Sequence, residues 1–253
     1  MGAVEAIIMG IVQGLTEFLP VSSSGHLVLM QRLFGITGEN IAFDVAVHLG
    51  SLIAVIIVFR KTIWDLIKHP FSPLAIKLYL ATIPTVLIVL LFKSTIEGSF
   101  TGDFFIVGFV LTIFILIISE YIAKKYKNEM PITKTNAVIL GIAQGLATLP
   151  GVSRSGTTIS TGLIMGNRKS EVAEFSFLMS IPIIIASAIY ELIFKMDYAS
   201  FDIVPMLLGM LFAFVFGFIA IKWMLQLVRK ANLLCFAIYL IILVAVILIF
   251  GLV

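Results

Sequence analysis

The chain has 253 residues, of which 60% are hydrophobic and only 12% are charged, and its formal net charge is +3. Soluble domains carry about 25% charged residues. This composition, with a mean hydropathy of +1.16, therefore excludes an ordinary soluble domain and predicts an all-α polytopic membrane protein. The positive charge lies in short loops, as is typical of membrane proteins, and predicts no nucleic-acid partner.

The first predicted element, residues 2–34, is apolar but interrupted. Pro20 removes a helical hydrogen-bond donor, and the serine and glycine run at 22–25 favours bent backbone. Non-helical backbone at membrane depth is tolerated only where protein or a wet cavity surrounds it. We therefore predict a re-entrant helix–loop–helix hairpin whose loop lies in the protein interior.

Three apolar spans, each long enough to cross a bilayer, follow this hairpin. A second interrupted region, 136–166, is broken by Pro150 and Gly151 and by a polar run, and predicts a second re-entrant hairpin. Three more spans complete the chain. The six predicted transmembrane spans are 41–60, 74–92, 103–123, 171–193, 203–223 and 232–252.

The two hairpin regions contain the same motif. GIVQGLTEFLPVSSSGH begins at Gly10 and GIAQGLATLPGVSRSGT begins at Gly141, an offset of 131 residues without a gap. The spans repeat at nearly the same offset, so each half, about 1–125 and 132–253, holds one hairpin and three spans. Three crossings per half invert the second half relative to the first. We predict a single membrane domain over 1–253 made of two inverted repeats.

Basic residues indicate the orientation in the membrane. They follow the first and third predicted spans and precede the fourth and sixth, which places all of these loops on one side. That side is expected to be cytoplasmic, so the first hairpin enters from outside and the second from inside. The basic residues are Arg60, Lys61, Lys68, Lys124, Lys125, Lys127, Lys134, Arg168, Lys169, Arg229 and Lys230.

The repeat keeps its apolar scaffold and changes its chemistry, which indicates that two copies form two halves of one site. The aligned pairs are Gln13 with Gln144, Glu17 with Thr148, Ser23 with Arg154 and His26 with Thr157. The glycine pairs Gly10/Gly14 and Gly141/Gly145 have GxxxG spacing, which predicts close helix packing rather than ligand contact.

In the first motif, Gln13 and Glu17 are four residues apart and share one helix face. An ionisable group at membrane depth is a functional candidate by default. Glu17 could act as a base or ligate Mg²⁺ or Ca²⁺, which take oxygen ligands, and Gln13 could add a carbonyl. The alternative is that Glu17 caps the broken helix or pairs with Arg154. Asp44 and His48, on one face of the first span, could support this site or form a satisfied interior pair.

The loop residues Ser22, Ser23 and Ser24 precede a helical run, and a helix N-terminus is a favourable anion site. His26 has an ordinary pKa near 6.5, which suits proton transfer. A serine within reach of a histidine is also the elementary nucleophile–base arrangement. The alternative is that the serines only satisfy backbone groups and that His26 is a hydrogen-bonded interior histidine.

The second loop places a guanidinium among hydroxyl groups. Arg154 can bind phosphate bidentately, and donors at low dielectric stabilise charge that develops on a phosphoryl oxygen. Arg154 stands in mid-segment, which makes a snorkelling arginine the weaker interpretation. The hydroxyl groups predicted to bind phosphate beside it belong to Ser153, Ser155, Thr157 and Thr158.

The motif pair, (E/Q)xxxE followed by PVSSSGH and then PGxSRSxxT, resembles the bacterial undecaprenyl-diphosphate phosphatase family, which is also associated with bacitracin resistance. The resemblance covers essentially the whole chain. It implies six spans with two re-entrant hairpins in an inverted repeat, and a site that opens to the extracytoplasmic side of the bacterial plasma membrane. It also implies removal of the terminal phosphate from undecaprenyl diphosphate to give the carrier lipid of cell-wall synthesis, with a divalent cation as cofactor.

One position departs from that family's pattern. The first motif position is often Glu in the family and is Gln13 here, so the acidic role falls on Glu17. Another class of membrane phosphatases, with PSGH followed by SRxxxxxH, fails because the sixth residue after Arg154 is Ser160. The resemblance places the family's motif residues on Gln13, Glu17, Ser22, Ser23, His26, Ser153, Arg154, Ser155 and Thr158.

The expected reaction is a phosphoanhydride hydrolysis in which Arg154 and a cation at Glu17 neutralise the diphosphate. Ser23 or a water attacks, and His26 serves as base and then acid. The expected partners are the polyprenyl diphosphate and the bilayer, and homodimerisation is left open. The rival interpretation is a secondary transporter or lipid flippase, because inverted repeats with broken helices are also a transporter architecture.

Overall fold

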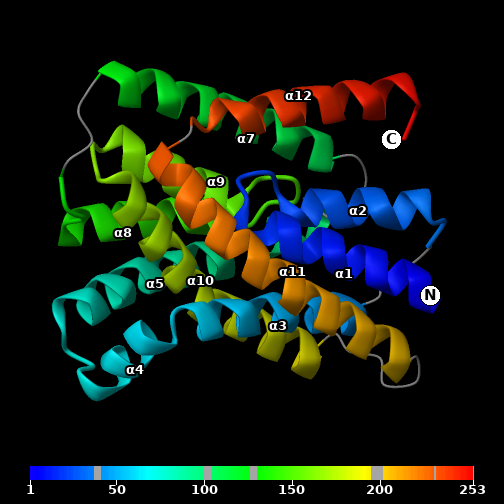
Figure 1. The fold of residues 1–253 in the computed structure, drawn as a ribbon, viewed down its shortest axis with the longest axis horizontal. Coiled ribbons are helices and arrows are strands. Elements are labelled where there is room, and N and C mark those ends of the chain that lie inside the picture. The colour runs from blue at the N-terminus through cyan, green and yellow to red at the C-terminus, as the bar shows by residue number, and fades with distance from the viewer. Residues whose placement is uncertain (37–40, 100–103, 126–129, 195–201, 231, 253) are drawn as a thin grey trace.

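The computed structural model describes the whole chain except residues 37–40, 100–103, 126–129, 195–201, 231 and 253 (Figure 1). The described residues form twelve α-helices and no β-strand. The helices are α1 (Ala3–Phe18), α2 (Ser23–Leu33), α3 (Ile41–Val58), α4 (Arg60–Lys68), α5 (Pro73–Leu91), α6 (Lys93–Ser99), α7 (Phe104–Lys125), α8 (Lys134–Leu146), α9 (Arg154–Ile164), α10 (Lys169–Phe194), α11 (Ile203–Lys230) and α12 (Leu234–Ile249).

Five of these helices, α3, α5, α7, α10 and α11, are long and apolar enough to cross a membrane. They confirm the first five predicted spans at the level of the element and make the chain a membrane protein. The sixth predicted span is α12, which is equally apolar but has only 16 residues, fewer than the about 20 that a perpendicular crossing needs. The six-span count therefore stays a prediction.

Helix α4 was not predicted. Arg60, Lys61 and Lys68 were predicted only as loop charges, but these residues and Trp64 lie on a separate helix of nine residues. None of its residues is buried, and the Lys68 ammonium lies 5.3 Å from the centre of the Trp64 ring. Lys127, another of the charges used for orientation, lies outside the described residues.

Both interrupted regions are helix–turn–helix pairs, α1 with α2 and α8 with α9, as predicted. In the first turn Ser22 adopts a left-handed backbone (φ 67°), and its hydroxyl accepts a hydrogen bond from Gly25 N at 3.3 Å, which caps α2. In the second turn Ser153 caps α9 in the same way, 3.0 Å from Gly156 N. The depth of the two pairs in the membrane stays a prediction.

The glycine pairs pack helices closely, as predicted. A Cβ at Gly10 would overlap the carbonyl oxygen of Gly209, so α1 lies directly against α11. A Cβ at Gly141 would overlap the carbonyl oxygen of Ala81, so α8 lies directly against α5. Each motif helix thus packs on a helix of the other half of the chain. Because α5 and α11 are equivalent in the repeat, the two contacts are equivalent as well.

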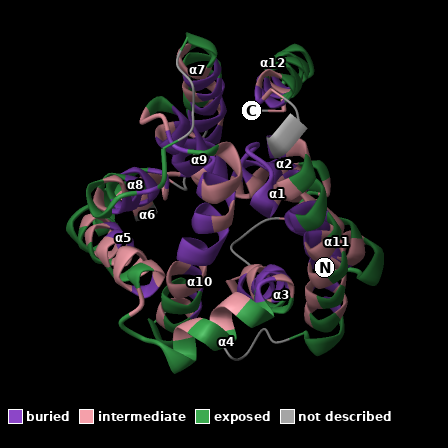
Figure 2. Ribbon diagram, turned by 60° about the vertical axis from the view of Figure 1, so that its left-hand side comes forward, coloured by how far each residue is buried: buried purple, intermediate pink, exposed green. Residues whose placement is uncertain are grey.

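The interior of the molecule holds the two turns (Figure 2). Buried residues gather along α1, α2, α9 and α10, whereas the outer faces of α5, α7, α11 and α12 are largely exposed. Exposed side chains on these outer faces include Leu87, Phe114, Leu211 and Ile242. Apolar side chains on this scale face lipid in a membrane protein, and the polar motif residues lie away from that surface.

Candidate active site

The two turns dock on each other through reciprocal contacts. The hydroxyl of Ser24 accepts a hydrogen bond from Gly151 N at 3.3 Å, and the hydroxyl of Ser155 donates to the Leu19 carbonyl at 2.9 Å. Ser24 and Ser155 are equivalent positions of the repeat. A Cβ at Gly25 would overlap Phe109 and lie 3.2 Å from Gly151 Cα, so only glycine allows this approach. The docking brings the first turns of α2 and α9 together.

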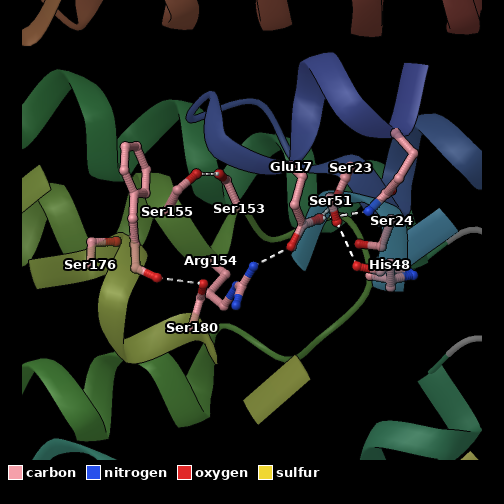
Figure 3. A network of polar contacts seen from close by, with 12 residues as sticks. Glu17, Ser23, Ser24, His48, Ser51, Ser153, Arg154, Ser155, Ser176 and Ser180 are labelled. Carbon is pink, nitrogen blue, oxygen red and sulfur yellow. Dashed lines mark hydrogen bonds and ion pairs between the residues drawn. The ribbon is translucent and has the colours of Figure 1, made fainter. Parts of the chain in front are cut away.

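Glu17 is the centre of the polar network that results (Figure 3). Its side chain is 5% exposed, and Arg154 Nη2 forms an ion pair with its Oε1. Gln13 Nε2 donates to Oε2 at 3.0 Å, and the Ser23 hydroxyl donates to the same oxygen at 2.5 Å. Gln13, Glu17, Ser23 and Arg154, all predicted as site residues, therefore meet in one network. Of the alternatives for Glu17, pairing with Arg154 is present.

Three atoms of the site are buried and have no hydrogen-bond partner among the described residues: Gln13 Oε1, Arg154 Nη1 and Thr157 Oγ1. Each such group costs about 1–3 kcal/mol of desolvation when it stays unpaired, so each calls for an explanation. A guanidinium donor and a hydroxyl suit phosphoryl oxygens, and an amide carbonyl suits a hard cation. The unpaired groups fit a phosphate and a cation.

His26 is hydrogen-bonded at both ring nitrogens, as in the alternative of a satisfied interior histidine. Its Nδ1 is 2.7 Å from the Ser22 carbonyl, and its Nε2 is 2.7 Å from the hydroxyl of Tyr239 on α12. Ser23 donates to Glu17 and not to His26, and the role of His26 as a base stays a prediction. Helical geometry accounts for the partners of His26: the imidazole bonds back to the carbonyl four residues earlier and turns its other nitrogen towards α12.

Five of the predicted phosphate-binding hydroxyls have structural partners: those of Ser24 and Ser155 join the two turns, and the other three have partners close in the chain or on α10. Ser22 and Ser153 cap their helices, and the hydroxyl of Thr158 donates to the Arg154 carbonyl at 2.9 Å and lies 2.6 Å from the Ser176 hydroxyl. Here the alternative, that loop hydroxyls satisfy backbone groups, matches the structure. These side chains hold the turns that carry Ser23 and Arg154.

Neighbouring helices add polar groups outside the two motifs, of which His48 was already a candidate from the sequence. The carbonyl oxygen of His48 accepts a hydrogen bond from the Ser51 hydroxyl at 2.8 Å, and the Nδ1 of His48 lies 2.7 Å from the carbonyl of Asp44. Tyr239 was missed altogether. It is a single polar ring in the aliphatic run of α12, yet it lies 213 residues from His26, so no local spacing could link the two.

The donor set limits the kind of metal site. Among the described residues there is no group of three or more His, Cys, Asp or Glu side chains that could hold a metal ion. Glu17 is the carboxylate of the network, with Oε1 paired to Arg154 and Oε2 accepting from Gln13 and Ser23, and the carbonyl oxygen of Gln13 has no partner among the described residues. This set fits a cation that takes its remaining ligands from substrate phosphates and water, as Mg²⁺ does, and does not fit an all-protein cage.

Fold and site together define a polytopic α-helical membrane protein whose interior joins a carboxylate, a guanidinium and a serine hydroxyl from two equivalent turns. Comparison with known families matches residues 6–246 to the family described as bacitracin resistance protein BacA. The chain belongs to this family.

Similar proteins in several organisms are named undecaprenyl-diphosphatase. The protein from Carboxydothermus hydrogenoformans is 42% identical over 244 residues, which cover 94% of each chain. The protein from Parabacteroides distasonis is 40% identical over 248 residues, 93% of each chain. The protein from Caldicellulosiruptor bescii is 38% identical over 260 residues, 99% of this chain and 98% of the relative.

Proposed function

We propose that this protein is an integral membrane phosphatase that hydrolyses undecaprenyl diphosphate to undecaprenyl phosphate and phosphate. Such a reaction recycles the cell-wall carrier lipid and confers bacitracin resistance. The observation that carries the proposal is the network in which Ser23, Glu17 and Arg154 meet. The family and the names of the relatives support the same substrate.

In the proposed reaction Ser23 attacks the terminal phosphorus. The 2.5 Å contact lets Glu17 accept the hydroxyl proton as the new O–P bond forms. The anhydride P–O bond breaks, and undecaprenyl phosphate leaves with the electron pair. A water then attacks the phosphorylated Ser23, while protonated Glu17 returns its proton to the serine oxygen.

Arg154 has two tasks in this scheme. Its Nη2 holds Glu17 in place, and its buried Nη1 donates to a phosphoryl oxygen of the bound diphosphate. The unpaired hydroxyl of Thr157, one helical turn further along α9, donates beside it. Phosphoryl transfer depends mainly on positioning and on stabilising the equatorial oxygens, and these two donors supply both.

We propose Mg²⁺ or Ca²⁺ as the cofactor. Glu17 and Gln13 would hold the ion together with oxygens of the diphosphate. When bound, the ion neutralises part of the diphosphate charge. The neutral Gln13 amide would help to hold the ion without adding a second negative charge beside Glu17, which already pairs with Arg154.

The proposed membrane layout has six spans and two re-entrant hairpins in two inverted repeats, in the bacterial plasma membrane with the site facing the extracytoplasmic side. The equivalent contacts of α1 with α11 and of α8 with α5 support the repeat. The apolar character of α12 supports its place as the sixth span, tilted little because it is short.

The deciding experiment measures phosphate release from undecaprenyl diphosphate by the purified protein in detergent, with and without a chelator. Release by the wild type and its loss in Arg154→Ala are expected. Arg60→Ala is the matched control, because Arg60 is an exposed arginine on α4, whose contact is the Ile57 carbonyl at 3.2 Å. Lipid movement in proteoliposomes without phosphate release would instead establish the transporter and refute the phosphatase.

A further inference from the structure

The imidazole of His26 is held at both nitrogens. Nδ1 lies 2.7 Å from the Ser22 carbonyl oxygen, which can only accept a hydrogen bond, so Nδ1 carries the proton. In the neutral ring the lone pair is then at Nε2, and it accepts from the hydroxyl of Tyr239 at 2.7 Å. The Ser22 carbonyl thus sets the tautomer, and the Tyr239 hydroxyl lies next to the basic nitrogen, Nε2.

The geometry of this second bond favours proton transfer. The rings of His26 and Tyr239 are nearly parallel, with an interplanar angle of 6° and centroids 5.8 Å apart, and the hydroxyl lies 2.7 Å from Nε2. Phe109 packs edge-on against the imidazole at 5.4 Å and 72°, which restrains its rotation. His26 is 5% exposed, whereas Tyr239 is 43% exposed. Tyr239 therefore covers the buried imidazole on the side of α12.

The equivalent positions in the other repeat do not form the same histidine–tyrosine contact. The repeat equivalent of Tyr239 is Gly108 on α7. A Cβ at Gly108 would overlap the carbonyl of Pro150, so α7 lies directly against the second turn. The equivalent of His26 is Thr157, whose hydroxyl has no partner among the described residues. Only the first half places a base at this position and covers it with a hydroxyl.

We propose that Tyr239 is a further catalytic residue, which passes a proton from the attacking water to Nε2 of His26. The proposal rests on the proposed function and completes it. Glu17 is engaged with Ser23 and receives its proton in the first step, so the second step needs another base. Ser23 and His26 are three residues apart on α2 and lie on neighbouring positions of one helix face, with about 5–6 Å between Cβ atoms.

Every proton in this step has a donor and an acceptor. As water attacks the phosphorylated Ser23, its proton moves to the Tyr239 oxygen while the tyrosine proton moves to Nε2. The O–P bond to Ser23 breaks, and its oxygen regains the proton from Glu17. His26 ends as an imidazolium, Tyr239 is unchanged, and the imidazolium then loses its proton to solvent or to the released phosphate.

The first test follows the phosphoenzyme. Tyr239→Phe keeps the ring and removes only the hydroxyl, so it should lower kcat about tenfold to hundredfold, up to the lower end of the about 10²–10⁴-fold contribution of general base catalysis, with KM changed less than threefold. Phosphate should accumulate on Ser23 in this variant relative to the wild type. Tyr79→Phe is the matched control, because Tyr79 is a half-exposed tyrosine of α5, and it should change neither quantity.

A double-variant cycle separates the relay from a packing role. In a His26→Gln background, Tyr239→Phe should lower kcat less than twofold, because the base it serves is absent. An equal loss in both backgrounds, or no accumulation of phosphoenzyme in Tyr239→Phe, overturns the proposal.

Nitrogen NMR of the histidines tests the contact without turnover. The chain has three histidines, so His26→Gln assigns the signal of His26. We expect the Nδ1–H tautomer and a shift of the Nε2 resonance in Tyr239→Phe but not in Tyr79→Phe. An unchanged resonance refutes the contact and with it the relay. A wild type that releases no phosphate refutes the proposed function and the relay, whereas the NMR result still decides whether Tyr239 holds His26.

Discussion

Replacing Glu17 by Gln tests both the stability and the chemistry of the network. The substitution keeps the shape of the side chain but removes the charge that pairs with Arg154, whose side chain is only 17% exposed. Breaking a buried ion pair by removing one partner costs about 3–5 kcal/mol. Because Arg154 keeps some exposure, we expect a loss of about 2–4 kcal/mol of unfolding free energy, somewhat less than for a fully buried pair.

The same variant removes the base that receives the Ser23 proton. General base catalysis contributes about 10²–10⁴-fold, so kcat for phosphate release should fall by at least about a hundredfold. The assays are phosphate release from undecaprenyl diphosphate and thermal unfolding, both in the same detergent. A double variant, Glu17→Gln with Arg154→Gln, removes both charges and should recover most of the stability while staying inactive.

Glu120→Gln is the matched control. Glu120 is also a buried carboxylate, 2% exposed, but it lies outside the site, where it accepts from Leu233 N at 2.7 Å and from Lys169 Nζ at 3.4 Å. The Glu120→Gln variant should have a lower unfolding free energy than the wild type but the same kcat. The reasoning is refuted if Glu17→Gln retains more than a tenth of the wild-type kcat, or if Glu120→Gln loses activity to the same degree at a temperature where both are folded.

Three further predictions concern the nucleophile, the cation and the packing. Ser23→Ala should give no phosphoenzyme in acid-quenched reactions and should lose activity, and full turnover in this variant would exclude serine attack. Gln13→Glu places a second carboxylate beside Glu17, so the apparent affinity for Mg²⁺ should rise and added Mg²⁺ should increase Tm more than in the wild type; an equal increase in both proteins would exclude Gln13 as a ligand. Gly141→Ala forces a Cβ onto the Ala81 carbonyl and should cost about 1–3 kcal/mol. Its control is Gly98→Ala, where nothing lies within 4 Å, and the packing argument fails if both variants have the same Tm.

The positions that the sequence predicted well are those where a local pattern has a local cause. Five long apolar runs became five long helices, because apolar length alone decides whether a helix can cross a bilayer. The turns at Pro20 and Pro150 followed from residues that break helices. The glycine pairs predicted close packing, and α1 and α8 do lie against α11 and α5 at those glycines.

The site was predicted in part. Gln13 and Glu17 share a helix face because of their spacing, and the repeat indicated that Arg154 belongs to the same site. The partner of Ser23 could not be predicted, because a serine and a histidine one turn apart can each turn to other groups. The serine hydroxyl bonds Glu17, while the imidazole bonds the Ser22 carbonyl.

By itself, then, the amino-acid order determined a membrane protein of apolar helices, two broken motif regions and the identity of the reactive groups, since these depend on composition and on neighbours along the chain. Only the tertiary structure decided which of those groups touch. Glu17 meets Arg154, and His26 meets Tyr239, across 137 and 213 residues of chain. Contacts of that range arise when whole helices pack, and side-chain direction at a helix interface depends on every residue that the neighbouring helix presents.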